Sequence, residues 1–386
     1  MEVQIVKFGK RVICWLLSVC IFLSLPCGVS ALSDEEIPAP AAVLMEADSG
    51  HVLYEKNAHE VRACASITKV MTLLLVMEAI DSGKIAWDDP VTASEHASSM
   101  GGSDIWLEPG ETMTVDEMVK ATVVASANDA AVALAELVSG TEEAFVAEMN
   151  KKATELGMEE TVFKNCNGLD EEGHVTSAYD VALMSRELIK HEEIFRYTSI
   201  WMDTLRGGKT QIVNTNKLLK SYQGITGLKT GTTGQAGSCI TATAERDHLK
   251  LIAVVLGSST GKERFTAAST LLDYGFANYA VAVPPLPEEA IVPIPVEGGM
   301  RQSVGTKTTA PENILIAKGK ESSLEPQVEL SEKVEAPVTQ GQVVGKIIYR
   351  LEGEVVAESE ITATENIEKV SFFAVLGVLM QQLFSL

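Results

Sequence analysis

The stretch Ala65-Ser66-Ile67-Thr68-Lys69, which leads into an apolar run ending near Ile80, is the most informative part of the sequence. It predicts a helix over 66–80 with Ser66 and Lys69 in the first turn. A spacing of three residues puts both on one helix face, with Cβ atoms about 5–6 Å apart. The positive field of a helix N-terminus, together with burial, favours an uncharged lysine, which is a usable base for a serine hydroxyl. The amides of the same terminus could donate to an oxyanion.

Two tripeptides further along the chain strengthen this interpretation. Ser126-Ala127-Asn128 is expected where one helix breaks and another begins, and Lys229-Thr230-Gly231 at the end of a strand that continues into 232–234. Glycine at that point permits a ligand to approach the backbone closely. Each tripeptide alone is common, but their order and expected surroundings make coincidence a poor explanation.

Other catalytic constellations are absent from the sequence. There is no G-x-S-x-G, no P-loop and no H-E-x-x-H, and the six histidines are scattered. Neither a metal site nor a Ser-His-Asp triad is therefore indicated, and no metal or organic cofactor is expected.

The surrounding pattern predicts an α+β fold. A hairpin is expected over 42–55, and Thr114 and Ser177 each have the spacing of a helix N-cap. Strands are expected over 225–230, 238–246 and 249–257, followed by a helix over 261–279. Strands at both ends with helices between them predict one antiparallel sheet assembled from both termini of the domain.

A second, smaller module is expected after residue 280. The proline-rich segment 283–288 has the composition of a stiff linker. Short alternating runs follow, such as 290–296 and 343–351, which predict a small all-β domain.

Both ends of the chain have the composition of targeting or membrane-attachment segments. Three basic residues precede an apolar run over 12–25, and Val29-Ser30-Ala31 offers small residues for cleavage, as in a secretory signal peptide. A retained N-terminal anchor is the alternative. The uncharged segment 370–386 carries a narrow stripe of small and polar residues, which suits an amphipathic helix in a membrane interface; the alternative is a packing helix of the last domain.

The net charge of the chain limits the classes of partner that it could bind. The chain has a formal net charge of −22, and removal of residues 1–31, whose net charge is +2, leaves −24. Nucleic acid is excluded, because phosphate contacts need a basic face. Cleavage also leaves three cysteines, Cys64, Cys166 and Cys239, which are interpreted as small buried hydrophobes.

The three motifs together resemble the penicillin-binding proteins and serine β-lactamases, and more specifically the low-molecular-mass serine D-alanyl-D-alanine carboxypeptidases. The resemblance covers about residues 38–279, and the following stretches carry it: Ala65–Lys69, Leu107–Gly110, Ser126–Ala130, Asn167–Leu169, Ser177–Asp180 and Gly227–Gly231. It implies a penicillin-binding-protein/β-lactamase-like catalytic domain, a β-rich C-terminal domain and an amphipathic anchor.

The resemblance also implies roles for individual residues. Ser66 would be the nucleophile, Lys69 would take its proton and Ser126 would relay a proton to the leaving D-Ala. The substrate-binding residues would be Asn128, Lys229, Thr230, Gly231, Thr232 and Arg264, with the oxyanion held by the backbone N–H groups of Ser66 and Thr232. Relatives often carry histidine where this chain has Thr232, so a side-chain contribution to deacylation is left open.

The expected reaction is removal of the terminal D-Ala from peptidoglycan stem pentapeptides, with penicillins and other β-lactams acylating Ser66. One alternative is a class A-like β-lactamase, but glutamates between the second and third motifs, including Glu142, Glu155 and Glu159, lack the E-x-x-L-N setting. A transpeptidase or endopeptidase shares all three motifs. A non-turnover penicillin-binding sensor or scaffold is the non-enzyme alternative.

The expected layout is a signal peptide at 1–31, a catalytic domain at 32–280, a β-rich domain at 281–366 and a membrane-anchor helix at 367–386. The protein would then be exported and held at the outer face of the bacterial cytoplasmic membrane, touching the membrane surface through its C-terminal helix.

Overall fold

The computed structural model describes residues 32–309, 311, 314–372 and 376. The predicted signal segment 1–31 and most of the predicted anchor lie outside these residues. Within them the helices are α2 (Lys69–Asp81), α3 (Glu95–Ser98), α4 (Val115–Lys120), α5 (Asn128–Ser139), α6 (Glu142–Glu155), α7 (Ala178–Leu188), α8 (Phe195–Thr198) and α9 (Gly261–Asn278). Two short turns matter for the site: the 3₁₀ turn η2 (Ala65–Thr68) and the π turn η3 (Ala121–Ala125).

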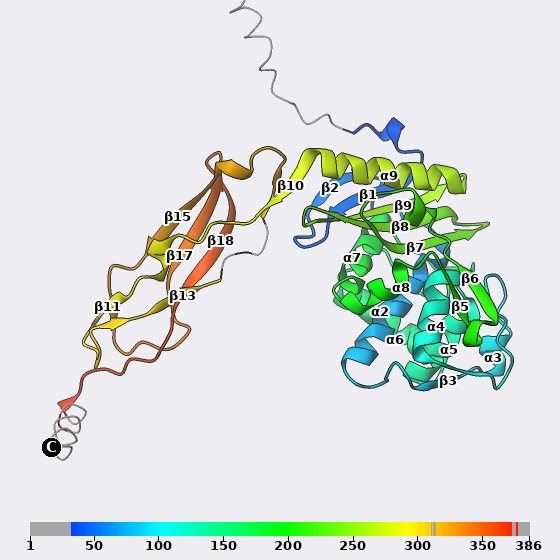
Figure 1. Ribbon diagram of the computed structural model, residues 1–386, viewed down its shortest axis with the longest axis horizontal. Helices are drawn as coiled ribbons and strands as arrows, with labels where there is room; N and C mark the ends of the chain where they lie inside the picture. Colours follow the sequence, from blue (N-terminus) through cyan, green and yellow to red (C-terminus); the bar gives the residue numbers. More distant parts are fainter. Residues whose placement is uncertain (1–31, 310, 312–313, 373–375, 377–386) are drawn as a thin grey trace, which may run out of the picture. The chain divides into compact units, whose positions relative to one another are not determined.

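The main sheet joins both ends of the first domain, as predicted. Its strands are β1 (Ala41–Glu46), β2 (Val52–Lys56), β7 (Ile225–Thr233), β8 (Gly237–Arg246) and β9 (Leu249–Ser258), in the order β2-β1-β9-β8-β7. All neighbours are antiparallel, and β7 is an edge strand. Helix α9 covers one face through β8 and β9, and α7 packs on the other against β1 and β9 (Figure 1). Two small ribbons accompany the helices: β3 (Pro90–Thr92) with β4 (Thr112–Thr114), and β5 (Met202–Leu205) with β6 (Thr210–Val213).

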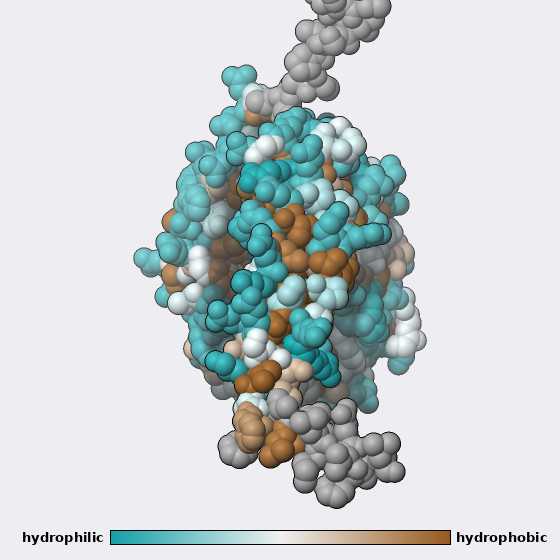
Figure 2. Space-filling view, turned by 90° about the vertical axis from the view of Figure 1, so that its left-hand side faces the viewer, coloured by the Kyte–Doolittle hydropathy of each residue, from teal (hydrophilic) through white to brown (hydrophobic). Residues whose placement is uncertain are grey.

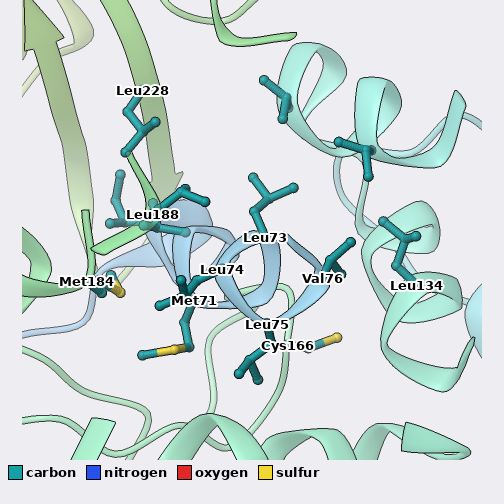
Figure 3. Close-up of a cluster of buried hydrophobic side chains, with 14 of the residues drawn as sticks. Met71, Leu73, Leu74, Leu75, Val76, Leu134, Cys166, Met184, Leu188 and Leu228 are labelled. Carbon is teal, nitrogen blue, oxygen red and sulfur yellow. The ribbon is translucent and has the colours of Figure 1, made fainter. Parts of the chain in front are cut away.

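Helix α2 runs through the middle of this domain. Its side chains are apolar around most of its circumference, which is the pattern of a helix enclosed on all sides. Leucines, methionines and valines of α2 pack against Leu134 of α5, Met184 and Leu188 of α7, and Leu228 of β7 (Figure 3). The residue that begins this helix, Lys69, is thereby held at a fixed position between the sheet and the helices.

Three details differ from the sequence-based expectation. Ser66 lies in the 3₁₀ turn η2, and the α-helix begins only at Lys69, because Ala65 has a left-handed backbone (φ 52°) that starts a tighter turn. The Lys229-Thr230-Gly231 motif lies inside β7, which continues to Thr233. The expected strand over 290–296 is split into a 3₁₀ turn and β11 (Ile294–Glu297), separated at Pro293, which has no N–H to donate.

The C-terminal part is all β, as predicted. Its four-stranded sheet has the order β13-β18-β17-β15, formed by β13 (Thr306–Thr308), β15 (Leu324–Leu330), β17 (Val343–Leu351) and β18 (Glu354–Ala363). A three-stranded sheet joins β11, β12 (Ser303–Val304) and β16 (Val334–Glu335), and β10 (Tyr279–Ala282) pairs with β14 (Ile314–Ala317). These strands enclose a separate apolar cluster that includes Ile347, Tyr349 and Ile361.

The surface in Figure 2 is mostly hydrophilic, with apolar residues in smaller patches. At the end of the described chain, however, Val370, Phe372 and Leu376 are 48%, 75% and 43% exposed. No helix among the described residues has both the length and the apolar character needed to cross a membrane.

Candidate active site

Ser66 lies in the turn between the sheet and α2. The left-handed backbone of Ala65 and the 3₁₀ turn that follows leave the Ser66 side chain half-buried, and its Oγ is 3.1 Å from Nζ of Lys69. Residues other than glycine uncommonly adopt positive φ. A strained backbone directly before a candidate nucleophile is the kind of distortion that functional sites retain.

Lys69 is completely buried and has three polar neighbours. Besides Ser66 Oγ, its Nζ contacts the side-chain oxygen of Asn128 at 2.5 Å and the backbone oxygen of Asn167 at 2.6 Å. No carboxylate among the described residues contacts the amine, and burial lowers the pKa of Lys69 to about 7. A substantial fraction of the amine is therefore neutral at neutral pH.

The three contacts determine where the lone pair of neutral Lys69 points. Asn128 donates through Nδ2 to the Gly101 carbonyl (2.6 Å), so its Oδ1 faces Lys69 as an acceptor. The Asn167 carbonyl can also only accept. A neutral amine has two N–H groups, which these two oxygens use, and the lone pair is left for the hydroxyl of Ser66. The geometry is that of a base already hydrogen-bonded to its nucleophile.

Ser126 and Lys229 form a second pair in the same centre. The π turn η3 ends at Ser126, whose left-handed conformation (φ 60°, ψ 30°) breaks the helix before α5 begins, as predicted. Nζ of Lys229 donates to Ser126 Oγ at 2.8 Å and to the Thr230 carbonyl at 3.0 Å. Burial lowers the pKa of Lys229 well below its ordinary value, and the nearby Lys69 and Arg264 lower it further.

The edge strand β7 passes directly beside the nucleophile. A Cβ on Gly231 would lie 2.9 Å from the backbone nitrogen of Ser66 and 2.8 Å from the Cys64 carbonyl, so only glycine allows this approach. The hydroxyl of Thr230 donates to Thr215 Oγ1 at 2.6 Å.

Thr232 and Arg264 complete the set of predicted residues. Thr232 is exposed, and its hydroxyl donates to the Gly231 carbonyl at 2.7 Å. Arg264, on α9, is 9% exposed and donates from Nη1 to the Gly231 carbonyl and to Thr232 Oγ1, both at 2.8 Å. Arg264 therefore supports β7, whereas Ser66, Lys69 and Asn128 are joined by direct hydrogen bonds, as are Ser126 and Lys229.

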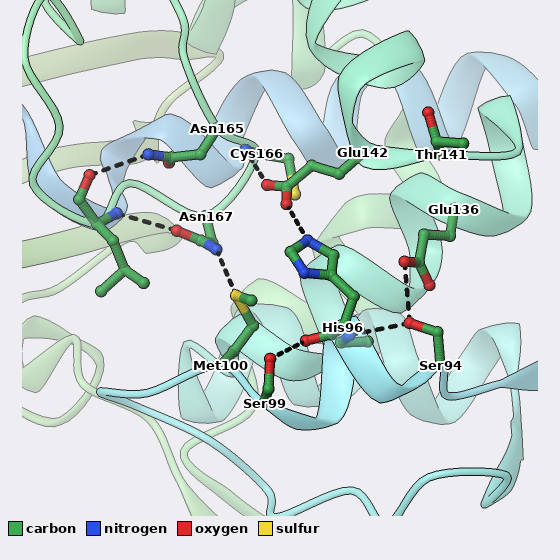
Figure 4. Close-up of polar contacts among 12 residues, drawn as sticks. Ser94, His96, Ser99, Met100, Glu136, Thr141, Glu142, Asn165, Cys166 and Asn167 are labelled. Atoms are coloured by element: carbon green, nitrogen blue, oxygen red, sulfur yellow. Dashed lines mark hydrogen bonds and ion pairs between the residues drawn. The ribbon is translucent and has the colours of Figure 1, made fainter.

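A loop near residue 167 supplies a contact that the sequence did not reveal. The Cys166 N–H donates to Glu142, whose other oxygen pairs with His96 at 2.6 Å (Figure 4). The Cys166 carbonyl accepts from Thr72 at 2.5 Å. Asn167 also donates to the sulfur of Met100. These bonds aim the Asn167 carbonyl at Lys69. Any residue type has that carbonyl, so no side-chain pattern could have identified its role.

Gly168 shows how tightly this loop fits the nucleophile turn. It has φ +85°, and a Cβ there would lie 2.0 Å from the Ala65 carbonyl oxygen. The loop and the turn are therefore in direct backbone contact.

The glutamates considered for a class A mechanism lie elsewhere. Glu142 is hydrogen-bonded to His96 and to the Cys166 N–H. Glu155 forms ion pairs with Lys151 and Lys152, and Glu159 is exposed. Among the described residues, none of their carboxylates contacts Ser66 or Lys69. The three described cysteines are free and buried, as predicted.

Comparisons with known proteins identify the family of the chain. Residues 28–260 match the family described as D-alanyl-D-alanine carboxypeptidase, and residues 286–369 match the C-terminal domain of penicillin-binding protein 5. The chain is 46% identical over 342 residues to D-alanyl-D-alanine carboxypeptidase DacF of Bacillus subtilis, covering 88% of both chains. It is 34% identical over 367 residues to DacC of Escherichia coli, covering 92% of both.

Solved structures show the same likeness. Penicillin-binding protein 5 from Haemophilus influenzae superimposes with a TM-score of 0.76 at 32% identity, covering 88% of this chain and all of that one. PBP3 from Streptococcus pneumoniae gives 0.71 at 33% identity, covering 86% of this chain and all of that one. The fold and these likenesses thus define a protein of the penicillin-binding class, with the contact between Ser66 and buried Lys69 as its candidate centre. The chain belongs to the D-alanyl-D-alanine carboxypeptidase family.

Proposed function

We propose that this protein is a serine-type carboxypeptidase that removes the terminal D-Ala from peptidoglycan stem pentapeptides through an acyl-enzyme on Ser66. The observation that carries the proposal is the contact between Ser66 Oγ and buried Lys69, whose two N–H groups are used by Asn128 and Asn167. Family membership supplies the reaction class, and this geometry supports the assignment of Ser66 and Lys69 to nucleophile and base.

Acylation begins with the transfer of the Ser66 hydroxyl proton to Nζ of Lys69. Oγ bonds to the carbonyl carbon of the penultimate D-Ala, and the backbone N–H groups of Ser66 and Thr232 donate to the oxyanion. The peptide C–N bond then breaks, and its nitrogen receives the proton held on Lys69, relayed through the hydroxyl of Ser126, so that Lys69 is neutral again. Ser126 is suited to this because its Oγ accepts from Nζ of Lys229 at 2.8 Å, which leaves its own hydroxyl hydrogen to be donated.

The terminal carboxylate of the substrate would lie along β7. The bound carboxylate would favour the protonated form of Lys229, against the burial that lowers the pKa of this lysine. The hydroxyls of Thr230 and Thr232 would donate to the carboxylate after turning from Thr215 and the Gly231 carbonyl. Arg264 supports this subsite by holding Gly231 and Thr232. Since β7 is an edge strand, its outer backbone groups are available to pair with an extended peptide, which Asn128 would help to hold.

Deacylation returns the enzyme to its starting state. Water attacks the acyl carbon, its proton passes to Lys69, and the ester bond to Oγ breaks as Ser66 regains a proton. A β-lactam would follow the acylation half of this path, because its amide and carboxylate take the places of the scissile bond and the terminus.

The decisive experiment measures D-Ala release from a stem pentapeptide by the purified protein. Ser66→Ala should abolish release while the protein stays folded. A stable penicillin adduct on intact protein without D-Ala release would refute the carboxypeptidase proposal in favour of a sensor or scaffold. Fast repeated turnover of nitrocefin would favour the β-lactamase alternative, and formation of cross-linked product would indicate a transpeptidase.

We also propose the domain layout 1–31, 32–280, 281–366 and 367–386, as signal, catalytic, β-rich and anchor segments, and a location at the outer face of the cytoplasmic membrane. The exposed Val370, Phe372 and Leu376 support an apolar anchor. A chain this acidic is repelled by anionic lipid, so its attachment must depend on apolar burial.

Ending the chain at Lys369 should release the protein from membranes. Sedimentation with vesicles measures this, and the full-length protein washed in high salt is the control, because apolar attachment survives salt screening. Continued sedimentation of the shortened protein would contradict the anchor.

A further inference from the structure

His174 is a buried titratable residue that the proposed mechanism does not use. It is 5% exposed and lies between Asn167 of the active-site loop and the N-terminus of α7. Its ring contacts Phe163 edge-on, with 5.8 Å between centroids. A buried histidine needs a hydrogen-bond partner for each ring nitrogen. One partner of His174 lies in the turn that carries Ser66, and the other lies in the loop that carries Asn167.

The hydrogen bonds of His174 determine its tautomer. The backbone N–H of Lys164 donates to Nδ1 at 3.1 Å, so Nδ1 must be unprotonated. Nε2 therefore carries the proton and donates to Thr68 Oγ1 at 2.7 Å. Burial lowers the pKa of His174 to about 4, against opposing effects of Glu171 and Asp170, so this neutral form persists at neutral pH.

The hydroxyl of Thr68 links His174 to the turn that carries Ser66. Its hydroxyl donates to the Ala65 carbonyl at 2.9 Å, and the sulfur of Cys64 is its other neighbour at 3.4 Å. The Ala65 carbonyl belongs to the same planar peptide unit as the Ser66 N–H. A donor to that carbonyl fixes the plane of the unit and polarises its N–H, as in a cooperative chain of hydrogen bonds.

We propose that His174 is a positioning residue for the oxyanion hole, acting through the Thr68 hydroxyl on the Ala65–Ser66 peptide. This rests on the proposed function, in which the Ser66 N–H donates to the oxyanion. The same ring closes the base of the loop 164–174, which carries Asn167 to Lys69. One imidazole thus sets both the oxyanion donor and the loop that orients the base.

Thr68→Val tests the relay, because it keeps the shape of the side chain and removes the hydroxyl. We expect the rate constant of Ser66 acylation by penicillin to fall about tenfold to hundredfold, below the roughly 10²–10³ that follows loss of a whole oxyanion donor. The dissociation constant of the initial complex should change less than threefold. In the acyl-enzyme, the ester carbonyl stretch in the infrared should move to higher wavenumber, since its hydrogen bond weakens.

Thr68→Ser, which keeps the hydroxyl, should restore both the rate and the band. His174→Gln, with an amide nitrogen that reaches the position of Nε2, should fall between wild type and Thr68→Val, and it provides a second test if Thr68→Val does not fold. Thr306→Val is a matched control: Thr306 is also a buried threonine donating to backbone carbonyls, but in the β-rich part.

An unchanged carbonyl band in folded Thr68→Val and His174→Gln would overturn the proposal, even if stability or rate fell, because a merely structural role does not alter the oxyanion hydrogen bond. Failure of the proposed function is a different result: wild-type protein would then form no acyl-enzyme on Ser66, or would form one without releasing D-Ala.

Discussion

Lys69→Ala should abolish acylation of Ser66 by penicillin and release of D-Ala. The substitution removes the only group among the described residues whose lone pair faces the Ser66 hydroxyl. Loss of a general base alone costs about 10²–10⁴ in rate. The buried oxygens of Asn128 and Asn167 would in addition lose their shared donor. Time-resolved labelling with a fluorescent penicillin measures the effect.

The control for this substitution is Lys151→Ala, since Lys151 is 78% exposed and its ion pair among the described residues is with Glu155. It should label at the wild-type rate. Labelling of Lys69→Ala at that rate would remove Lys69 from the role of base.

The pH dependence of acylation and of stability follows from the burial of Lys69. The pKa of Lys69 is lowered from its usual 10.5 to about 7, so acylation should rise with pH and level off above about 7 as the amine loses its proton. Between about 7 and 10.5 the unfolded chain binds a proton that the folded protein does not, so the free energy of unfolding should rise with pH across this window. The contribution of Lys69 to this change is of order 3–6 kcal/mol.

Lys69→Met removes this titration and should lower the slope of the stability profile over that window by the share of one proton, while Lys229 and the buried thiols keep their own contributions; the variant should remain inactive. Urea unfolding at a series of pH values checks it. A slope equal to that of wild type would show that Lys69 is not the group responsible.

Gly168→Ala should be the most damaging substitution outside the polar centre. The new methyl group would meet the Ala65 carbonyl at 2.0 Å and would impose a left-handed backbone on alanine. The two costs together amount to about 2–5 kcal/mol of stability. Since the clash pushes on the peptide unit that carries the Ser66 N–H, acylation should fall at least about tenfold in the protein that remains folded.

Gly140→Ala separates these two costs. Gly140 has the same φ of +85°, but nothing lies within 4 Å of the position of its Cβ. It should lose only the smaller, conformational part, about 1–2 kcal/mol, and keep wild-type acylation. Thermal melting measures the stability of both variants, and penicillin labelling measures their acylation rates. Equal losses in the two variants would mean that the contact with Ala65 is unimportant.

Local pattern was sufficient for much of the fold. The strand β17 and the starts of β7, β9 and α9 lie where alternation, turn residues and caps predicted them. The order of the three motifs likewise identified the polar side chains that converge at the site. These features follow from residue types near one another in the chain, which is where a sequence is most informative.

Tertiary structure alone decided how the site works. The Asn167 carbonyl, the tautomer of His174 and the support of β7 by Arg264 depend on contacts between residues from 25 to 106 positions apart. A backbone carbonyl is the same in every residue, and a histidine is equally compatible with a core or a surface position. The sequence by itself therefore determined which groups carry the chemistry, whereas the fold decided the direction of the lone pair of Lys69, because only its packed neighbours use its two N–H groups.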